Sequence, residues 1–236
     1  RVIFLYMTGG VSHVDSFDPK PALFAGHGKQ ITVDNWQGKL GQFARYLKKP
    51  NWEFRPGGQS GVEVSDLFPH VRDVVDKLCV LRSVASDHTN HYESTLGMHC
   101  GSWTFARPSI GSWISYGLGT ENRNLPSFVV LAPHAPYAGA QTWGSDFLPG
   151  CHQGTQLIPG DDPLPNVRSR ADSLDAQQVE LELLASANRR HLAERPGDAA
   201  LEARIRSFET AFGMQREAPE ALDFSGETAD TLKMYG

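Results

Sequence analysis

The segment Val2-Ile-Phe-Leu-Tyr-Met-Thr-Gly-Gly-Val-Ser-His-Val-Asp-Ser-Phe-Asp18 joins an unbroken apolar run to two glycines and a polar stretch. A continuous β-branched and aromatic run of this length is typical of a strand that is buried on both faces of a parallel sheet. In open α/β sheets, ligands bind beyond the carboxyl ends of the strands. The segment therefore predicts an α/β protein in which the polar residues 8–18 lie where a site is expected.

The following residues extend this pattern. Apolar residues at helical spacing predict a helix over 65–78, which leads into a second strand at 78–81. Two further helices are expected at 94–99 and 109–117, before another strand at 125–132. Alternation of strands and helices favours a mostly parallel sheet flanked by helices.

Three longer segments complete the expected domain. Residues 19–61 and 133–165 are rich in Gly and Pro without a sustained period, so both are interpreted as loop inserts, the first with short helical pieces. Within the first insert, 57–61 lacks the lysine of a P-loop and predicts a turn. Residues 173–213 carry two apolar stripes among charged residues, which predicts a helix pair that packs on the sheet or on a partner chain.

Composition excludes several classes of protein. The 236 residues are 40% apolar and carry 22 basic against 27 acidic side chains, a net charge of −5 without long runs of one sign. That balance disfavours binding to nucleic acid. Every apolar run is far shorter than the roughly 20 residues that span a bilayer, so no membrane span is expected.

The first candidate site follows the opening strand. His13, Asp15 and Asp18 crowd together after Gly9 and Gly10. Imidazole and carboxylate together suit zinc, manganese or iron, whereas carboxylates alone favour calcium or magnesium. The alternative is structural: an aspartate caps the following turn, and the histidine bonds to backbone.

The second candidate site is the segment Ser86-Asp-His-Thr-Asn-His-Tyr-Glu93, which again follows a strand and precedes a helix. It offers Ser86 and Thr89 as hydroxyl nucleophiles beside Asp87, His88 and His91, and a helix N-terminus attracts anions. Here too a structural alternative exists, in which Asp87 and Asn90 cap the helix and the imidazoles are exposed.

Together the two segments suit the hydrolysis of a sulfate or phosphate ester. The reaction needs a cation that neutralises the nonbridging oxygens, and donors aimed at the developing negative charge. His13, Asp15, Asp87 and His91 are the candidate metal ligands. The expected nucleophile is Ser86 or Thr89, and Asn90 is expected to contact the ester oxygens. The expected cofactor is a divalent ion, namely zinc, calcium or manganese, and the expected substrate is a small-molecule or glycan ester.

Several long motifs carry a resemblance, namely Phe4-Leu-Tyr-Met-Thr-Gly-Gly-Val-Ser-His-Val-Asp-Ser-Phe-Asp-Pro-Lys-Pro21, Gly58-Gln-Ser-Gly61, Leu67-Phe-Pro-His70, Leu81-Arg-Ser83, Ser86-Asp-His-Thr-Asn-His91 and Arg107-Pro-Ser-Ile-Gly-Ser-Trp-Ile-Ser-Tyr-Gly-Leu-Gly119. Together they resemble one family of exported bacterial proteins, domain of unknown function 1501. Its resemblance to alkaline phosphatases and sulfatases implies that fold, a hydrolase activity, and export by a twin-arginine signal to the periplasm or cell envelope. In the wider superfamily the first strand ends in a metal-binding Asp, where this chain has Thr8, so His13 or Asp15 would have to substitute. Later Asp and His ligands of the superfamily have no counterpart before Gly236, so residues 1–236 are expected to be the N-terminal part of one domain, truncated at its C-terminus.

Two other functions stay open from the sequence. Thr8 in place of an Asp favours an exported, non-catalytic protein of the same fold, whose inserts at 19–61 and 133–165 bind a glycan or a protein. A third hypothesis uses the helix pair over Leu174 to Phe212 for assembly. The sequence leaves the oligomeric state open.

Overall fold

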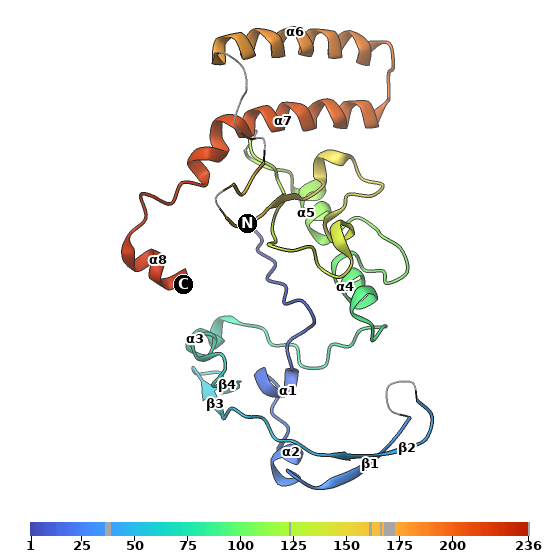
Figure 1. The fold of residues 1–236 in the computed structure, drawn as a ribbon, viewed down its shortest axis with the longest axis vertical. Helices are drawn as coiled ribbons and strands as arrows, with labels where there is room; N and C mark the ends of the chain where they lie inside the picture. The colour runs from blue at the N-terminus through green and yellow to red at the C-terminus, as the bar shows by residue number, and fades with distance from the viewer. Residues whose placement is uncertain (36–38, 123, 161, 166, 168–172, 236) are drawn as a thin grey trace. The chain divides into compact units, whose positions relative to one another are not determined.

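A computed structural model describes residues 1–35, 39–122, 124–160, 162–165, 167 and 173–235. The chain divides into two compact units, residues 1–85 and residues 86–236, and each is described by itself. The described residues combine helices with three two-stranded sheets, so the protein is mixed α/β (Figure 1). Parts of the expected inserts at 19–61 and 133–165, namely residues 36–38 and 161, lie outside the described residues.

The first unit is built from two antiparallel strand pairs and short helices. Strands β1 and β2 pair from Gln30 with Tyr46 to Asp34 with Gln42. Strands β3 and β4 pair from Phe54 with Ser65 to Gly57 with Val62. The elements of this unit are α1 (His13–Ser16), α2 (Pro21–Ala25), β1 (Gln30–Asp34), β2 (Gln42–Tyr46), β3 (Phe54–Gly57), β4 (Val62–Ser65), α3 (Pro69–Asp73) and the 3-10 helix η2 (Val75–Lys77).

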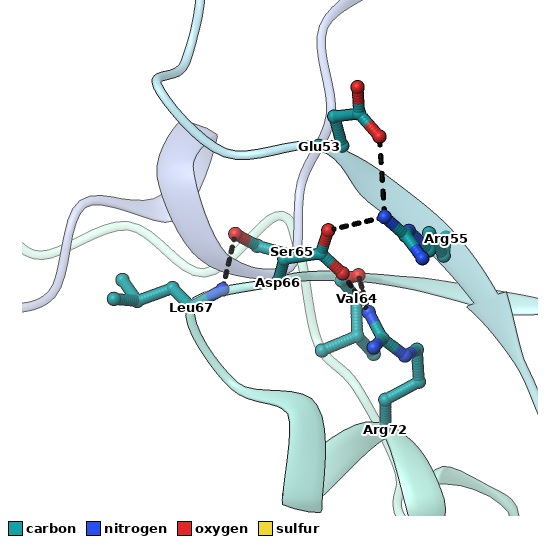
Figure 2. Close-up of polar contacts among 7 residues, drawn as sticks. All are labelled: Glu53, Arg55, Val64, Ser65, Asp66, Leu67 and Arg72. Carbon is teal, nitrogen blue, oxygen red and sulfur yellow. Dashed lines mark hydrogen bonds and ion pairs between the residues drawn. The ribbon is translucent and has the colours of Figure 1, made fainter.

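An aspartate between two arginines ties β3, β4 and α3 together (Figure 2). Asp66 lies 3.1 Å from the guanidinium of Arg55 and 2.5 Å from that of Arg72. Arg72 also donates to the carbonyl of Val64 at 3.5 Å. Val64 and Val75 are buried beside this network, so a small apolar core is bordered by ion pairs.

The turn between β3 and β4 is closed by a carboxylate. Asp76 accepts hydrogen bonds from the backbone N–H groups of Gln59 and Ser60, each at 2.8 Å. These two bonds, with a side-chain bond from Ser60, lower the pKa of Asp76. Gly58 has a φ of +56°, which favours glycine, and any Cβ there would overlap the Asp76 carboxylate. The predicted turn at 57–61 is therefore confirmed.

The second unit contains the longer helices. Asn90 and Gly101 flank α4, and Gly101 has the left-handed conformation that ends helices. Ser109 caps α5 by accepting a hydrogen bond from the N–H of Ser112. The elements are α4 (His91–Cys100), α5 (Ile110–Leu118), β5 (Val129–Leu131), the 3-10 helices η3 (Gly139–Trp143) and η4 (Gly150–His152), β6 (Thr155–Leu157), α6 (Leu174–Ala193), α7 (Ala199–Ala221) and α8 (Ala229–Tyr235).

Helices α6 and α7 form an antiparallel pair, as Figure 1 shows. Gln177 near the start of α6 donates to Gln215 near the end of α7 at 2.7 Å, which fixes the antiparallel arrangement. The predicted helical segment at 173–213 is therefore confirmed as two helices, although α7 runs on to Ala221. Val179, Leu183 and Phe208 stay exposed on this pair. No helix of the described residues is long and apolar enough to cross a membrane.

Several predicted elements are wrong. Residues 2–7 and 78–81 form no strand, and Val2, Ile3 and Leu5 are exposed. The expected mostly parallel sheet is not found among the described residues, where β5 and β6 make a parallel pair and the other two pairs are antiparallel. A strand exists only where another strand accepts its hydrogen bonds, and an apolar run does not encode that partner.

Other predicted elements are confirmed in whole or in part. The helices at 94–99 and 109–117 are confirmed as α4 and α5, and β5 lies inside the predicted strand at 125–132. The helix at 65–78 is shortened to α3 and η2, because Ser65 ends β4. The insert at 19–61 contains the predicted short helix, α2, but also three strands.

Alanine substitutions at Gly58 and Gly61 distinguish the cost of positive φ from the cost of steric overlap with Asp76. Gly58→Ala and Gly61→Ala both place alanine at positive φ, which costs about 1–2 kcal/mol, but the Cβ at position 61 meets open space. We expect Gly58→Ala to lower the urea midpoint of unfolding more than Gly61→Ala. The extra loss should vanish in an Asp76→Ala background, where the overlapping carboxylate is gone. Equal effects of both substitutions in the native background would contradict this account of the turn.

Candidate functional site

The loop before α4 is organised by the side chain and the backbone of Asn90. Its Oδ1 accepts a hydrogen bond from the N–H of Tyr92 at 3.1 Å, which caps the helix. Its own N–H donates to Nδ1 of His88 at 3.1 Å. Asn90 therefore fixes both the start of the helix and the orientation of the imidazole before it, and the structural alternative expected for Asn90 is confirmed.

His88 is held on three sides. The ring stacks on Trp103 with centroids 5.2 Å apart, and the hydroxyl of Ser94 donates to the His88 carbonyl. Because Nδ1 accepts from the N–H of Asn90, the neutral ring carries its proton on Nε2. His88 is half-buried, so it differs from the exposed imidazole of the structural alternative.

Glu93 presents a buried carboxylate oxygen to this ring. Oε2 lies 3.8 Å from Nδ1 of His88, and within the described part of the chain no hydrogen-bond donor reaches it. Nδ1 already accepts a hydrogen bond from Asn90 N–H, so a neutral His88 has no proton on this nitrogen to donate to Glu93. A buried acceptor without a donor is costly and is commonly satisfied by an ion or a water molecule.

Sequence reasoning did not single out Glu93 as a ligand. The spacing Asn90-x-x-Glu93 is that of a capping box, in which the glutamate reaches back to the backbone N–H of the cap residue. In the structure His88 takes that N–H instead, so the carboxylate of Glu93 is left for another partner. The capping-box spacing was the signal in the sequence that could have drawn attention to Glu93. That spacing does not show that His88, two residues before the cap, competes with Glu93 for the N–H of Asn90.

The other candidate residues of this loop face solvent. Ser86, Asp87, Thr89 and His91 are exposed. Ser86 Oγ accepts from the N–H of His88 at 3.5 Å, a long contact that leaves the hydroxyl accessible. The ring of His91 stacks on Tyr137 with centroids 4.9 Å apart. The loop thus combines two accessible hydroxyls with an exposed carboxylate and an exposed imidazole.

The first candidate segment lies in the other unit. His13 and Asp15 belong to the single-turn helix α1, and Asp15 accepts from the hydroxyl of Ser12 at 2.7 Å. Asp18 is buried and lies 2.7 Å from Lys20, whose hydrogen bond lowers the pKa of that carboxyl. Both aspartates thus have side-chain partners, a hydroxyl and an ammonium group, whereas the structural alternative placed an aspartate on the backbone of the following turn.

The donor types suit a divalent ion, but the described residues gather no cluster of three or more His, Cys, Asp or Glu side chains that could hold one. In the second unit, Asp87, His91 and Glu93 come from one loop and the first turn of the helix that follows it. Carboxylate and imidazole together are ligands of zinc and manganese. The chemistry of these donors therefore fits a cation, although their arrangement does not complete a ligand shell.

A second histidine environment was not expected from the sequence. Buried Ser115 on α5 lies 2.8 Å from Nδ1 of His152 and 2.5 Å from the hydroxyl of Ser127. Burial lowers the pKa of His152, and the positive charge of Arg206 lowers it further. The contact between Ser115 and His152 joins α5 to η4. The serine spacing along 109–115 was the available signal, but it does not reveal the histidine 37 residues later.

Comparison with known proteins gives one match. A family model described as "Protein of unknown function (DUF1501)" matches residues 1–236. No curated protein and no solved structure matches the chain.

Substitutions of Asn90 test its two roles. Asn90→Ala removes the cap and should lower the free energy of unfolding by about 1 kcal/mol, measured by urea denaturation. Asn90→Asp keeps an oxygen that can accept from Tyr92 N–H, so its stability should stay close to that of the native protein. If Asn90→Ala unfolds at the same urea concentration as the native protein, the cap does not organise this loop.

Proposed function

We infer that this chain, which belongs to the DUF1501 family of proteins of unknown function, forms part of a metal-dependent hydrolase of sulfate or phosphate esters. The loop 86–91 and the first turn of α4 would supply the nucleophile and part of the cation site. This proposal includes an alkaline phosphatase-like fold, as the resemblance of the opening and second motifs implies. It also includes export to the periplasm or cell envelope.

The observation that carries the proposal is the buried oxygen of Glu93. It has no donor among the described residues, and it lies beside an imidazole whose facing nitrogen is already occupied. A cation would satisfy this oxygen without a proton. Glu93 would supply one ligand of this ion, and Asp87, His91, His13 and Asp15 stay candidate ligands, although the described residues gather no three such side chains into one cluster.

The ion would supply positive charge that neutralises the ester oxygens and lowers the pKa of a nearby hydroxyl. The chain's own residues would do the rest. As the oxygen of Ser86 or Thr89 bonds to sulfur or phosphorus, its hydroxyl loses a proton to solvent water, and the bond from sulfur or phosphorus to the ester oxygen breaks. That ester oxygen takes a proton from water and leaves as an alcohol, and a covalent ester to the protein remains. Water then cleaves this ester, releases sulfate or phosphate, and restores the hydroxyl.

Asn90 has a defined part in this scheme. Its Oδ1 is engaged with the backbone of Tyr92, so the amide nitrogen Nδ2 is the group that would donate to a nonbridging oxygen. The cap holds this nitrogen in place before substrate arrives. Asn90→Asp would therefore keep the fold and lose the donor.

Hydrolysis of 4-nitrophenyl phosphate and 4-nitrophenyl sulfate by the full-length protein tests the proposal. We expect Ser86→Ala or Thr89→Ala, whichever removes the nucleophile, to lower kcat by about a hundredfold or more. Thr104→Ala is a matched control, because Thr104 is also an exposed threonine of the second unit, and it should leave kcat unchanged. Folding of each variant is checked by circular dichroism.

Two outcomes would count against the proposal. Native protein that is folded, supplied with zinc, manganese and calcium, and inert on both esters would contradict a hydrolase of this kind. Full activity in both Ser86→Ala and Thr89→Ala would remove this loop as the source of the nucleophile.

A further inference from the structure

An open cleft lies on the second unit, away from the loop 86–91. A cleft of about 950 Å³ lies between the segment 145–155 and the N-terminal half of α7. Its apolar lining includes Leu148 and Ala203, which are both buried. None of the residues used in the proposed hydrolysis lines this cleft.

Two aromatic rings border the cleft. Phe147 is 73% exposed, and its ring meets the edge of Trp113 with centroids 5.9 Å apart. Phe208 is 58% exposed on α7. A flat apolar ring that is open to solvent can pack against an apolar surface of a ligand, and both rings lie at the same cleft.

Polar groups of both kinds accompany the rings. The guanidinium of Arg204 lies over the ring of Phe208 at 5.8 Å, which steadies a side chain that can only donate hydrogen bonds. Asp146 can only accept them, and it is held at a φ of +46°. Gln153, also in the lining, can do both.

This combination selects among ligand classes. The opposite charges of Asp146 and Arg204 cancel, so a phosphate or sulfate group gains little from the cleft as a whole. A purely apolar ligand would leave the polar groups without partners. A sugar ring has C–H faces that pack on aromatic rings and hydroxyls that both donate and accept.

We propose that this cleft binds a neutral sugar unit of a glycan, with Phe147 and Phe208 against the ring faces and Asp146, Arg204 and Gln153 on the hydroxyls. The cleft falls partly in the insert at 133–165, one of the two segments that the sequence offered for glycan recognition. The site does not depend on ester hydrolysis, and it would serve equally to hold the glycan part of an ester substrate.

Titration of the full-length protein with neutral hexasaccharides of glucose, galactose, mannose, xylose and N-acetylglucosamine, each alone, tests the proposal by calorimetry. We expect at least one to bind, and Phe147→Ala and Phe208→Ala each to weaken its binding tenfold or more. Phe224→Ala is the matched control, because Phe224 is 63% exposed in the same unit and does not line the cleft. Asp146→Asn should weaken binding, because it replaces the carboxylate that accepts from the sugar hydroxyls. Asparagine tolerates the positive φ at this position, so the backbone and the two phenylalanine rings should stay as they are.

The outcomes separate this site from the hydrolase. Ser86→Ala and Thr89→Ala should bind the sugar as the native protein does, whatever their effect on ester cleavage. Absence of binding for all five hexasaccharides at millimolar concentration would overturn the proposal. Unchanged binding in Phe147→Ala and Phe208→Ala, or an equal loss in Phe224→Ala, would overturn it too.

Discussion

The pair of hydrogen bonds made by Asn90 is the interaction on which the candidate site depends. One bond starts α4 at Tyr92 N–H, and the other occupies Nδ1 of His88. Because Nδ1 of His88 accepts the hydrogen bond from Asn90 N–H, Glu93 loses the partner that its position in a capping box would give it. The local backbone requirement thus creates the unsatisfied carboxylate oxygen that the functional proposal uses.

Glu93 differs from three carboxylates of the first unit. Asp66 lies between two arginines, Asp76 accepts from two backbone N–H groups, and buried Asp18 pairs with Lys20. Their partners hold the pKa of Asp76 and of Asp18 below the ordinary value, which marks groups that are satisfied as anions. Those three carboxylates serve the fold of the first unit, whereas Glu93 is the one that a cation would complement.

The sequence predicts this protein well where structure is local. Helices α4 and α5 carry their own caps in Asn90, Gly101 and Ser109, and the turn at 57–61 carries glycines that its backbone requires. Strand partners are not local, so the apolar run at 2–7 predicted a strand that is not formed, while the β1–β2 hairpin was missed. The loop 86–91 was found because its polar residues are adjacent in sequence. The unpaired oxygen of Glu93 depends on His88 taking the N–H of Asn90, which the capping-box spacing alone does not reveal. The cleft beside α7 depends on packing between distant segments, which no local spacing encodes.

The metal content of the full-length protein tests the central claim most directly. After exposure to zinc, manganese and calcium and removal of free ions, inductively coupled plasma mass spectrometry gives the ions bound per chain, in the native protein and in Glu93→Gln. The account predicts about one or two divalent ions per native chain and a clear loss in the variant, which keeps the shape of Glu93 without its charge. A folded native protein that retains no divalent ion, or a variant that retains as many as the native protein, would contradict it.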